Sequence, residues 1–396
     1  MLRKLTTLLT FGSACALPSS LMARQNNSTT ESRKLIIGAP FQILTADFDG
    51  SQFSITGNHT AVGTAPSWLL YNAPNRLYAV NENANDTSLF TLGSANASDL
   101  TLSSAASGSS GVVFLEFNAD KTRIVGAAYG SGRIDIWDVS APDGSLKLLK
   151  TIVIPGEPNP AEGAHHPHQA LLDPTGRFFV VPNLGGDSIL IVDGESDKWE
   201  IVGTVKLPTG TGPRHGGFIT SGKTTYYALA SELTSELFLF ELAYPGDTID
   251  FKQLQVQSTY GTDPPANSSS AAAGELIVAA NGKDVYVSNR ISGNETDSIA
   301  HFVFNSNSNS SASLDYAEFV STGGLRPRMF SLSKDEKQSL AFVANQGGDV
   351  GLLALKRCAD SGALNPTPVA TVPYQTLVAP RLAETEYMGP QFVLEI

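Results

Sequence analysis

The sequence predicts an all-β protein folded as a seven-bladed β-propeller with four antiparallel strands in each blade. Helical periodicity is scarce along the 396 residues, and short β-rich runs bounded by Gly, Pro, Asn and Asp dominate. Seven of these runs resemble one another and end at Gly38, Asn81, Ala128, Asn183, Ser231, Asn289 and Asn345. The steps between these anchor positions, 43 to 58 residues, are typical of a four-stranded propeller blade.

Each unit follows the same order of elements. An apolar inner strand leads into a tight turn such as residues 173–176, where Pro fixes φ and Gly supplies a positive φ. The anchor strand comes next, followed by a polar loop such as residues 184–187, a third strand such as residues 188–193, and a more polar fourth strand. The last run, residues 390–396, is expected to complete the sheet begun by residues 34–45. The N- and C-terminal strands would then share the closing blade, which leaves no unpaired strand edge around the ring.

Two other all-β interpretations are weaker. A pair of β-sandwich domains predicts a linker or a change of composition near the middle of the chain, and neither is present. The dipeptide Trp137-Asp138 does not indicate a WD40 protein, because the other units lack it. One propeller over residues 35–396 is therefore predicted.

The first residues have the order of a secretory signal peptide. Arg3 and Lys4 precede an uncharged apolar stretch, residues 5–17, and small residues follow. That stretch is too short for a membrane span, and no later stretch is long enough. Residues 1–23 are therefore predicted to be a signal peptide and residues 24–34 a polar tail. The protein is expected outside the cell, either free or associated with the cell wall.

Eight Asn-x-Ser/Thr acceptor sites accompany this signal. One such site is weak evidence, but eight in a chain with a signal peptide predict a glycoprotein that carries N-glycans. The acceptor residues are Asn26, Asn27, Asn58, Asn85, Asn96, Asn267, Asn294 and Asn309. Most lie in Ser- and Asn-rich stretches typical of exposed loops.

Composition excludes several function classes. The 38 acidic side chains outnumber the 26 basic ones, for a net charge of -12, so a broad nucleic-acid-binding surface is not expected. Two cysteines cannot build a scaffold held together by several disulfides.

Two motifs resemble known binding sites but do not fit the repeat. Residues 217–224 match the P-loop pattern, which needs a helix after the loop, whereas a strand-like run follows here. Gly222 occupies the hairpin position that Gly176 holds in the preceding unit, so nucleotide binding is not expected. His166 and His168 are two residues apart and would face the same way on an extended segment. No third ligand lies nearby, so no metal site is assigned.

Propeller geometry brings two sets of positions to one end of the central channel. The strands of a blade run up and down, so the start of the inner strand and the end of the anchor strand lie at the same rim. These positions hold His166, His168, Arg214, His215 and Arg328 at inner-strand starts, and Glu82, Glu232, Arg290 and Gln346 just past the anchors. Three arginines thus converge in an acidic chain, and arginine is well suited to binding carboxylate or phosphate. The sequence therefore predicts a site for a small anion.

Structural roles for the same residues stay open from the sequence alone. An arginine before a strand is often solvated at a rim, and Glu232 could pair with Arg214 only to support the fold. His168 could support a loop, and Glu82 could cap one. The joint placement of these side chains in the repeat register favours the anion site.

Several segments resemble the seven-bladed lactonase family, which includes 6-phosphogluconolactonases of one bacterial type and fungal carboxy-cis,cis-muconate cyclases. The segments are HPHQALLDPTGR at 166–177, VPNLGGD at 181–187 and GPRH at 212–215, with GLRPR at 324–328 and VANQGGD at 343–349 in a later blade. The resemblance spans roughly residues 35–396. In the fungal cyclase branch it implies a cofactor-free site of histidine, arginine and glutamate. On the matching motifs those residues are His166 or His168, Arg214, Glu232 and Arg290, and the sequence does not decide between the two histidines.

The resemblance implies a cofactor-free lactonase or cycloisomerase that acts on a small carboxylated substrate. In the lactonising direction, one substrate carboxylate adds to a conjugated double bond, and Glu232 or the histidine would deliver a proton to the neighbouring carbon. In lactone hydrolysis the same pair would activate water. The arginines would hold the carboxylates and oppose developing negative charge. Substrate binding is assigned to Arg328, His215, Glu82 and Gln346.

A protein without catalytic activity is the alternative function. Propellers are rigid scaffolds, and a fold does not fix a function. The predicted signal peptide and acceptor sites also suit a secreted or cell-surface glycoprotein with an adhesion or interaction role.

Overall fold

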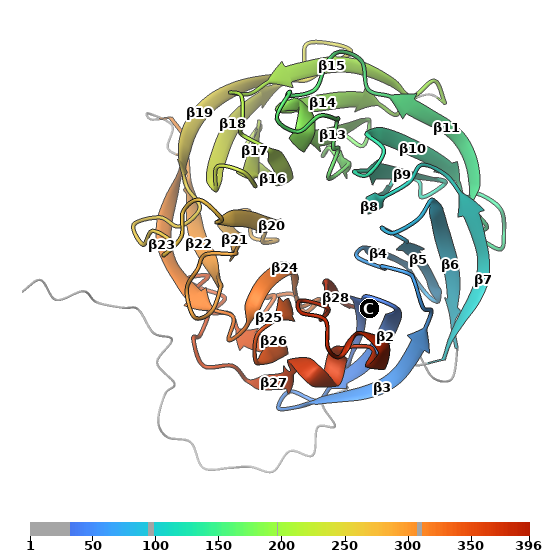
Figure 1. The fold of residues 1–396 in the computed structure, drawn as a ribbon. Coiled ribbons are helices and arrows are strands. Elements are labelled where there is room, and N and C mark those ends of the chain that lie inside the picture. Colours follow the sequence, from blue (N-terminus) through green and yellow to red (C-terminus); the bar gives the residue numbers. More distant parts are fainter. Residues whose placement is uncertain (1–31, 94–98, 196, 307–310) are drawn as a thin grey trace, which may run out of the picture.

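The computed structural model describes residues 32–93, 99–195, 197–306 and 311–396, which form seven four-stranded antiparallel sheets. Figure 1 shows these sheets as the blades of a ring around a central axis. The predicted seven-bladed β-propeller is confirmed. The predicted signal peptide lies outside the described residues, as do Asn26, Asn27, Asn96 and Asn309. None of the helices in the described ranges is long and apolar enough to cross a membrane.

The blades are named here in chain order, and their strands are given from the innermost to the outermost. Blade one has β28 (Phe392–Glu395), β1 (Arg33–Ala39), β2 (Gln42–Phe48) and β3 (Phe53–Thr60). Blade two has β4 (Leu69–Asn72), β5 (Arg76–Val80), β6 (Asp86–Leu92) and β7 (Leu100–Ser107). Blade three has β8 (Val112–Phe117), β9 (Arg123–Ala128), β10 (Arg133–Asp138) and β11 (Lys147–Val153). Blade four has β12 (Leu171–Leu172), β13 (Phe178–Asn183), β14 (Ser188–Asp193) and β15 (Glu200–Lys206), with the short 3-10 helix η1 (Leu184–Gly186) after β13.

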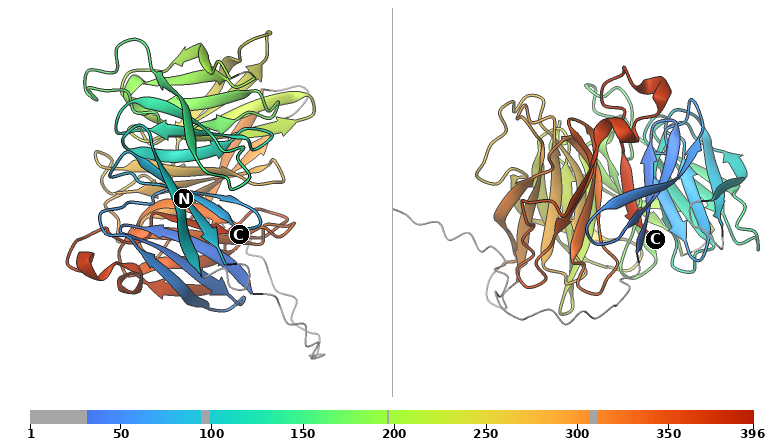
Figure 2. Two further views of the ribbon diagram at one scale, coloured as in Figure 1. Left: turned by 90° about the vertical axis from the view of Figure 1, so that its right-hand side faces the viewer. Right: turned by 90° about the horizontal axis from the view of Figure 1, so that it is seen from below.

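The remaining three blades follow the same order. Blade five has β16 (Pro213–Ser221), β17 (Thr224–Ser231), β18 (Glu236–Ala243) and β19 (Asp250–Ser258). Blade six has β20 (Ala272–Val278), β21 (Asp284–Arg290), β22 (Ser298–Asn305) and β23 (Ser313–Ser321). Blade seven has β24 (Leu325–Leu332), β25 (Leu340–Gly347), β26 (Val350–Lys356) and β27 (Ala370–Pro373). The segment between β27 and β28 carries η2 (Tyr374–Leu377) and η3 (Pro380–Leu382) and projects from one face of the ring (Figure 2).

Blade one closes the ring by pairing strands from opposite ends of the described chain. β28 pairs antiparallel with β1, from Leu35 opposite Glu395 to Gly38 opposite Phe392. β1 begins at Arg33, inside the region predicted to be a polar tail. The reason is that Arg33 forms ion pairs with Asp335 at 3.1 Å and with Glu395 at 2.9 Å, which attach the start of β1 to the ring.

The core lies between neighbouring blades. The anchor strands β13 and β21 are buried along their whole length, whereas the outermost strands β3 and β7 alternate between exposed and half-buried side chains. Phe114 of blade three packs in one cluster with Phe179 and Trp199 of blade four. Burial of such apolar side chains between sheets stabilises each blade against its neighbour.

The P-loop-like segment lies in a hairpin. Residues 217–224 join the end of β16 to the start of β17, and Gly222 has the positive φ of 62° that the tight turn requires. A strand follows the segment, so the helix N-terminus that holds phosphate in a true P-loop is not formed.

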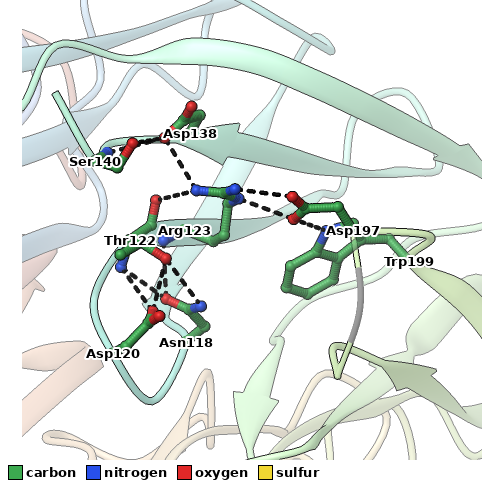
Figure 3. Close-up of polar contacts among 8 residues, drawn as sticks. All are labelled: Asn118, Asp120, Thr122, Arg123, Asp138, Ser140, Asp197 and Trp199. Carbon is green, nitrogen blue, oxygen red and sulfur yellow. Dashed lines mark hydrogen bonds and ion pairs between the residues drawn. The ribbon is translucent and has the colours of Figure 1, made fainter.

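Arginine clamps join neighbouring blades on the face where the anchor strands begin. Arg123, the first residue of β9, donates to Asp138 of its own blade at 3.0 Å. Its Nε and Nη2 donate to both oxygens of Asp197 in blade four, at 3.0 and 2.9 Å (Figure 3). Trp199 also donates to Asp197, at 3.2 Å, and so fixes the acceptor. The loop between the third and fourth strands of blade four is thereby tied to the anchor strand of blade three.

The same position is used at other blade junctions. Arg76 at the start of β5 donates to the carbonyl of Pro142 in blade three, and Arg177 before β13 contacts Asp247 of blade five at 2.9 Å. At the junction of blades six and seven the charges are exchanged: Asp284 begins β21, and the buried Arg357 of blade seven donates to it.

Candidate active site

β-Bulges at the starts of the inner strands shape one end of the channel. The pairing of β8, β16, β20 and β24 with their anchor strands shifts register within the first few residues. The extra residues that these shifts leave unpaired are Val113, Arg214, Gly274 with Glu275, and Arg328. A bulge re-aims its side chain away from the regular pleat. Three of the residues that line the channel mouth, Val113, Arg214 and Arg328, therefore come from bulged positions.

A cavity of about 180 Å³ lies at this end of the channel. Its lining residues come from blades two to seven and are Glu82, Val113, Tyr129, His168, Arg214, Glu232, Arg290 and Arg328. The structure thus brings Arg214, Glu232 and Arg290 to one cavity, as the repeat register predicts. Its volume lies below the roughly 300–1,000 Å³ of pockets that hold drug-sized ligands, so it suits one small molecule.

Two carboxylates are shared among the three arginines. Oε2 of Glu232 lies 2.8 Å from Nε of Arg214 and 3.1 Å from Nη2 of Arg290. Arg328 donates to Glu82 at 2.8 Å. Burial raises the pKa of Glu232, but Arg290 and Arg214 outweigh it and hold the pKa below its usual value, so the carboxyl is ionised at neutral pH.

Positive charge is in excess inside the cavity. Three guanidinium groups face two carboxylates, which leaves one net positive charge on the lining residues. Burial, followed by the neighbouring Arg290, lowers the pKa of Arg214 to about 9, so Arg214 stays cationic at neutral pH. Among the described residues, Nη1 of Arg214 and Nε of Arg290 have no hydrogen-bond partner, although both atoms are buried. Buried donors without a partner favour an anionic ligand at this position.

His168 occupies the wall of the cavity and is held from behind. Its Nδ1 lies 3.0 Å from Nε2 of His215, and Nδ1 of His215 lies 2.8 Å from Oε1 of Glu275. All three side chains are buried. Burial lowers the pKa of His168 well below 6.5, and Arg214 and His215 lower it further, so the ring is neutral at pH 7.

The structure distinguishes the two histidines. His166 stacks on Tyr129 with 4.3 Å between ring centroids, and its Nδ1 lies 2.7 Å from the Tyr129 carbonyl oxygen. It is absent from the cavity lining, whereas His168 is part of it. Both side chains adjoin Tyr129, but His168 is buried whereas His166 is half-buried. The site residue is therefore His168.

Two other predicted site residues do not line the cavity. His215 lies behind His168, beside a smaller cavity, and does not reach the larger one. Gln346 is also absent from the lining, because the segment after β27 packs beside it. The amide of Gly389 donates to the Gln346 carbonyl at 3.0 Å, and Tyr387 covers Arg326 with 3.5 Å from the guanidinium carbon to the ring centroid. Glu82 does line the cavity, through its ion pair with Arg328.

Three residues of the site were missed by sequence reasoning. Tyr129 follows the anchor Ala128, so the rule that selected Glu232 and Arg290 would also have selected it. Glu275 lies in the unpaired stretch at the start of the inner strand of blade six, one residue beyond the position that Arg214 holds in blade five. Val113 holds this position in blade three. For Glu275 and Val113, the unpredicted bulges set the side-chain direction.

Metal ligation has no candidate group in the part of the chain that the structure describes. No set of three or more His, Cys, Asp or Glu side chains is placed there to hold a metal ion.

Fold and site together define a propeller with an anion-binding cavity at one end of its channel. Residues 29–380 match the family described as "Lactonase, 7-bladed beta-propeller". The chain belongs to this lactonase family, and membership supports an enzyme of the lactonase or hydrolase class.

Individual relatives agree with this family. A probable 6-phosphogluconolactonase of Arthroderma benhamiae is 32% identical over 258 residues, which are 63% of this chain and 64% of that protein. The match thus covers less than two thirds of the fungal relative. The structure of a periplasmic gluconolactonase from Pseudomonas aeruginosa has a TM-score of 0.74 at 22% identity and covers 92% of this chain and 99% of its own. A putative 6-phosphogluconolactonase from Bacteroides fragilis has a TM-score of 0.70 at 20% identity, over 87% and 99%. These two likenesses concern the fold.

Proposed function

We propose that the protein hydrolyses a small anionic lactone at this cavity without a cofactor. One observation carries the proposal: a neutral imidazole, His168, borders a cavity in which buried arginine donors have no partner among the described residues. A base beside fixed cationic donors is the combination that ester hydrolysis requires. The excess of one positive charge suits a lactone that carries one negative charge.

The bond changes follow from the same atoms. Nε2 of His168 takes a proton from water as the water oxygen bonds to the lactone carbonyl carbon. The carbonyl oxygen becomes an oxyanion that Arg214 and Arg290 stabilise through their free N–H groups. The bond between the carbonyl carbon and the ring oxygen then breaks, and the ring oxygen takes the proton from His168. The product is the open-chain hydroxy acid, and His168 returns to its neutral form.

Lactonisation of a carboxymuconate is the second candidate reaction. The same arginines suit its carboxylates, but this reaction needs an acid that protonates carbon. Glu232 is held ionised and His168 is neutral, so neither holds a readily donated proton. Tyr129 is the cavity-lining hydroxyl in the described residues, and burial, followed by Glu232, raises its pKa, so it stays protonated. Tyr129 would therefore replace Glu232 or His168 as the acid expected from the sequence.

A substrate panel tests the proposed reaction. Purified protein should hydrolyse 6-phosphogluconolactone or a carboxylated lactone faster than neutral gluconolactone. The reason is that the excess positive charge of the cavity attracts the negative charge of the substrate. A pH-stat that follows acid release measures hydrolysis, and ultraviolet absorbance follows carboxymuconate. Consumption of carboxymuconate without lactone hydrolysis would replace the proposal by the cyclase reaction. Inactivity on every compound would favour the non-catalytic glycoprotein.

We further propose that the protein is a secreted glycoprotein. The described acceptor residues Asn58, Asn85, Asn267 and Asn294 are all exposed. Expression of the full chain in a eukaryotic secretory host should deliver the protein to the medium, and enzymatic removal of N-glycans should lower its mass. A variant in which these four asparagines are replaced by glutamine should lose most of that shift. Retention inside the cell with no mass change would contradict the proposal.

A further inference from the structure

Behind His168 lies a buried chain of polar groups that the proposed hydrolysis does not use directly. His215 contacts His168 on one side and Glu275 on the other, at 3.0 and 2.8 Å. Oε1 of Glu275 also accepts the backbone N–H of Leu276 at 3.2 Å. Glu275 is 3% exposed and His215 is 1% exposed, so bulk water does not compete for these contacts. Which atom donates and which accepts in each of these hydrogen bonds is therefore set by the three side chains alone.

We infer that Glu275 and His215 form a relay that sets the tautomer of His168 and presents its bare Nε2 to the substrate cavity. An ionised carboxylate only accepts, so the proton of His215 lies on Nδ1. The Nε2 of a neutral His215 then accepts, so the proton of His168 lies on Nδ1. The remaining nitrogen of His168, Nε2, carries a lone pair and is the one left for the cavity. As a function for the site, this inference rests on the proposed hydrolysis.

The two relay residues act through His168 and do not contact substrate. The smaller cavity beside them has a volume of about 10 Å³, close to the minimum for a single water molecule and far too small for a lactone. His215 is further fixed between aromatic rings, 5.7 Å from Trp68 and 5.6 Å from Phe114 between centroids. Glu275 and His215 are therefore positioning residues.

The charge on Glu275 has a second effect. When His168 takes a proton from water, positive charge develops next to Arg214, whose own charge opposes it. The negative charge of the Glu275 carboxylate offsets the repulsion between Arg214 and the developing positive charge on His168. Its effect is already seen at His215, whose pKa is lowered by burial but raised again by Glu275. The other charged or titratable groups around the pair are Arg214, Arg328, Glu232, Glu82 and Tyr129. Removing the Glu275 charge should therefore lower the proton affinity of His168.

Nuclear magnetic resonance tests the relay without reference to activity. In wild-type protein labelled with ¹⁵N-histidine, the ring nitrogen shifts should show His168 and His215 protonated at Nδ1 and bare at Nε2 at pH 7. Protonation of His168 at Nε2 would overturn the relay, even if the protein hydrolyses lactones. The expected tautomers in a protein that hydrolyses none would leave the relay intact and remove the proposed function.

Kinetics of Glu275→Gln provides a second test on the substrate found by the panel. We expect kcat to fall on the order of 10- to 100-fold with little change in KM, the range known for losing a group that orients a metal-bound histidine. The acid limb of the pH profile should move to lower pH by about one unit, because an opposite charge is lost. The matched control is Glu116→Gln, which also changes a glutamate on an inner strand but lies outside both cavities. Loss of thermal stability with an unchanged pH profile would reduce Glu275 to a structural role.

Discussion

Replacement of His168 by glutamine is expected to lower kcat/KM for lactone hydrolysis by about 10² to 10⁴, the usual contribution of a general base. Glutamine is similar in length and polar, but it cannot take a proton from water at neutral pH. In the wild type, burial and the neighbouring Arg214 keep the pKa of His168 well below 6.5, so the base form persists as the pH falls. Activity should thus remain steady from pH 7.5 to 6.5 and fall only at lower pH.

The matched control is His166→Gln, two residues away. This side chain stacks on Tyr129 outside the cavity, so its loss should leave kcat/KM within a few-fold of the wild type. Steady-state kinetics of both variants, with circular dichroism to confirm folding, gives the comparison. Equal loss in the two variants, or greater loss in His166→Gln, would remove His168 from its role as the base.

Replacement of Arg214 by glutamine is expected to lower kcat by about 10² to 10³, the usual cost of removing one donor to a developing oxyanion. Arg214 is 2% exposed and its Nη1 has no partner among the described residues, so a bound anion is its natural acceptor. Arg214→Lys should also be impaired, because lysine keeps the charge but not the planar fork of donors. Competition by a carboxylate product should weaken in both variants.

Stability needs a separate control, because Arg214 is one partner of a buried ion pair. Removing one partner of such a pair often costs about 3–5 kcal/mol. The double variant Arg214→Gln with Glu232→Gln removes both charges and should recover much of the lost melting temperature without recovering activity. The control Arg133→Gln replaces an exposed arginine on β10 and changes the net charge as much as Arg214→Gln does. It should match the wild type in melting temperature and in activity. Recovery of activity in the double variant would show that Arg214 serves only to compensate Glu232.

The repeat made the fold predictable from the sequence, because each blade carries the same order of apolar strand, turn and anchor. The anchors Asn183, Asn289 and Asn345 end buried strands as expected, and β28 closes blade one beside β1. Convergence of the arginines followed from the same register. These features depend on periodicity and on the direction of strands, both of which are visible along the chain.

The finer geometry of the site depends on features that have no sequence signal here. A bulge adds one or two unpaired residues to one strand of a pair. Nothing in the sequence before Glu275 indicates the bulge in β20. The difference in depth between His166 and His168 depends on how the chain enters the channel. Gln346 is covered by the segment between β27 and β28, an excursion for which the blade repeat offers no template.

The polar contacts between neighbouring blades favour one order of the blades, because in each contact a donor on one blade faces an acceptor on the other. Blades two, three and four each extend an arginine forward, whereas blade six extends Asp284 toward Arg357 of blade seven. If blade seven were to follow blade four, Arg177 would meet Arg357, and two like charges would oppose the docking. A recombinant ring with blades exchanged or duplicated would therefore lose a complementary contact wherever donor no longer faces acceptor.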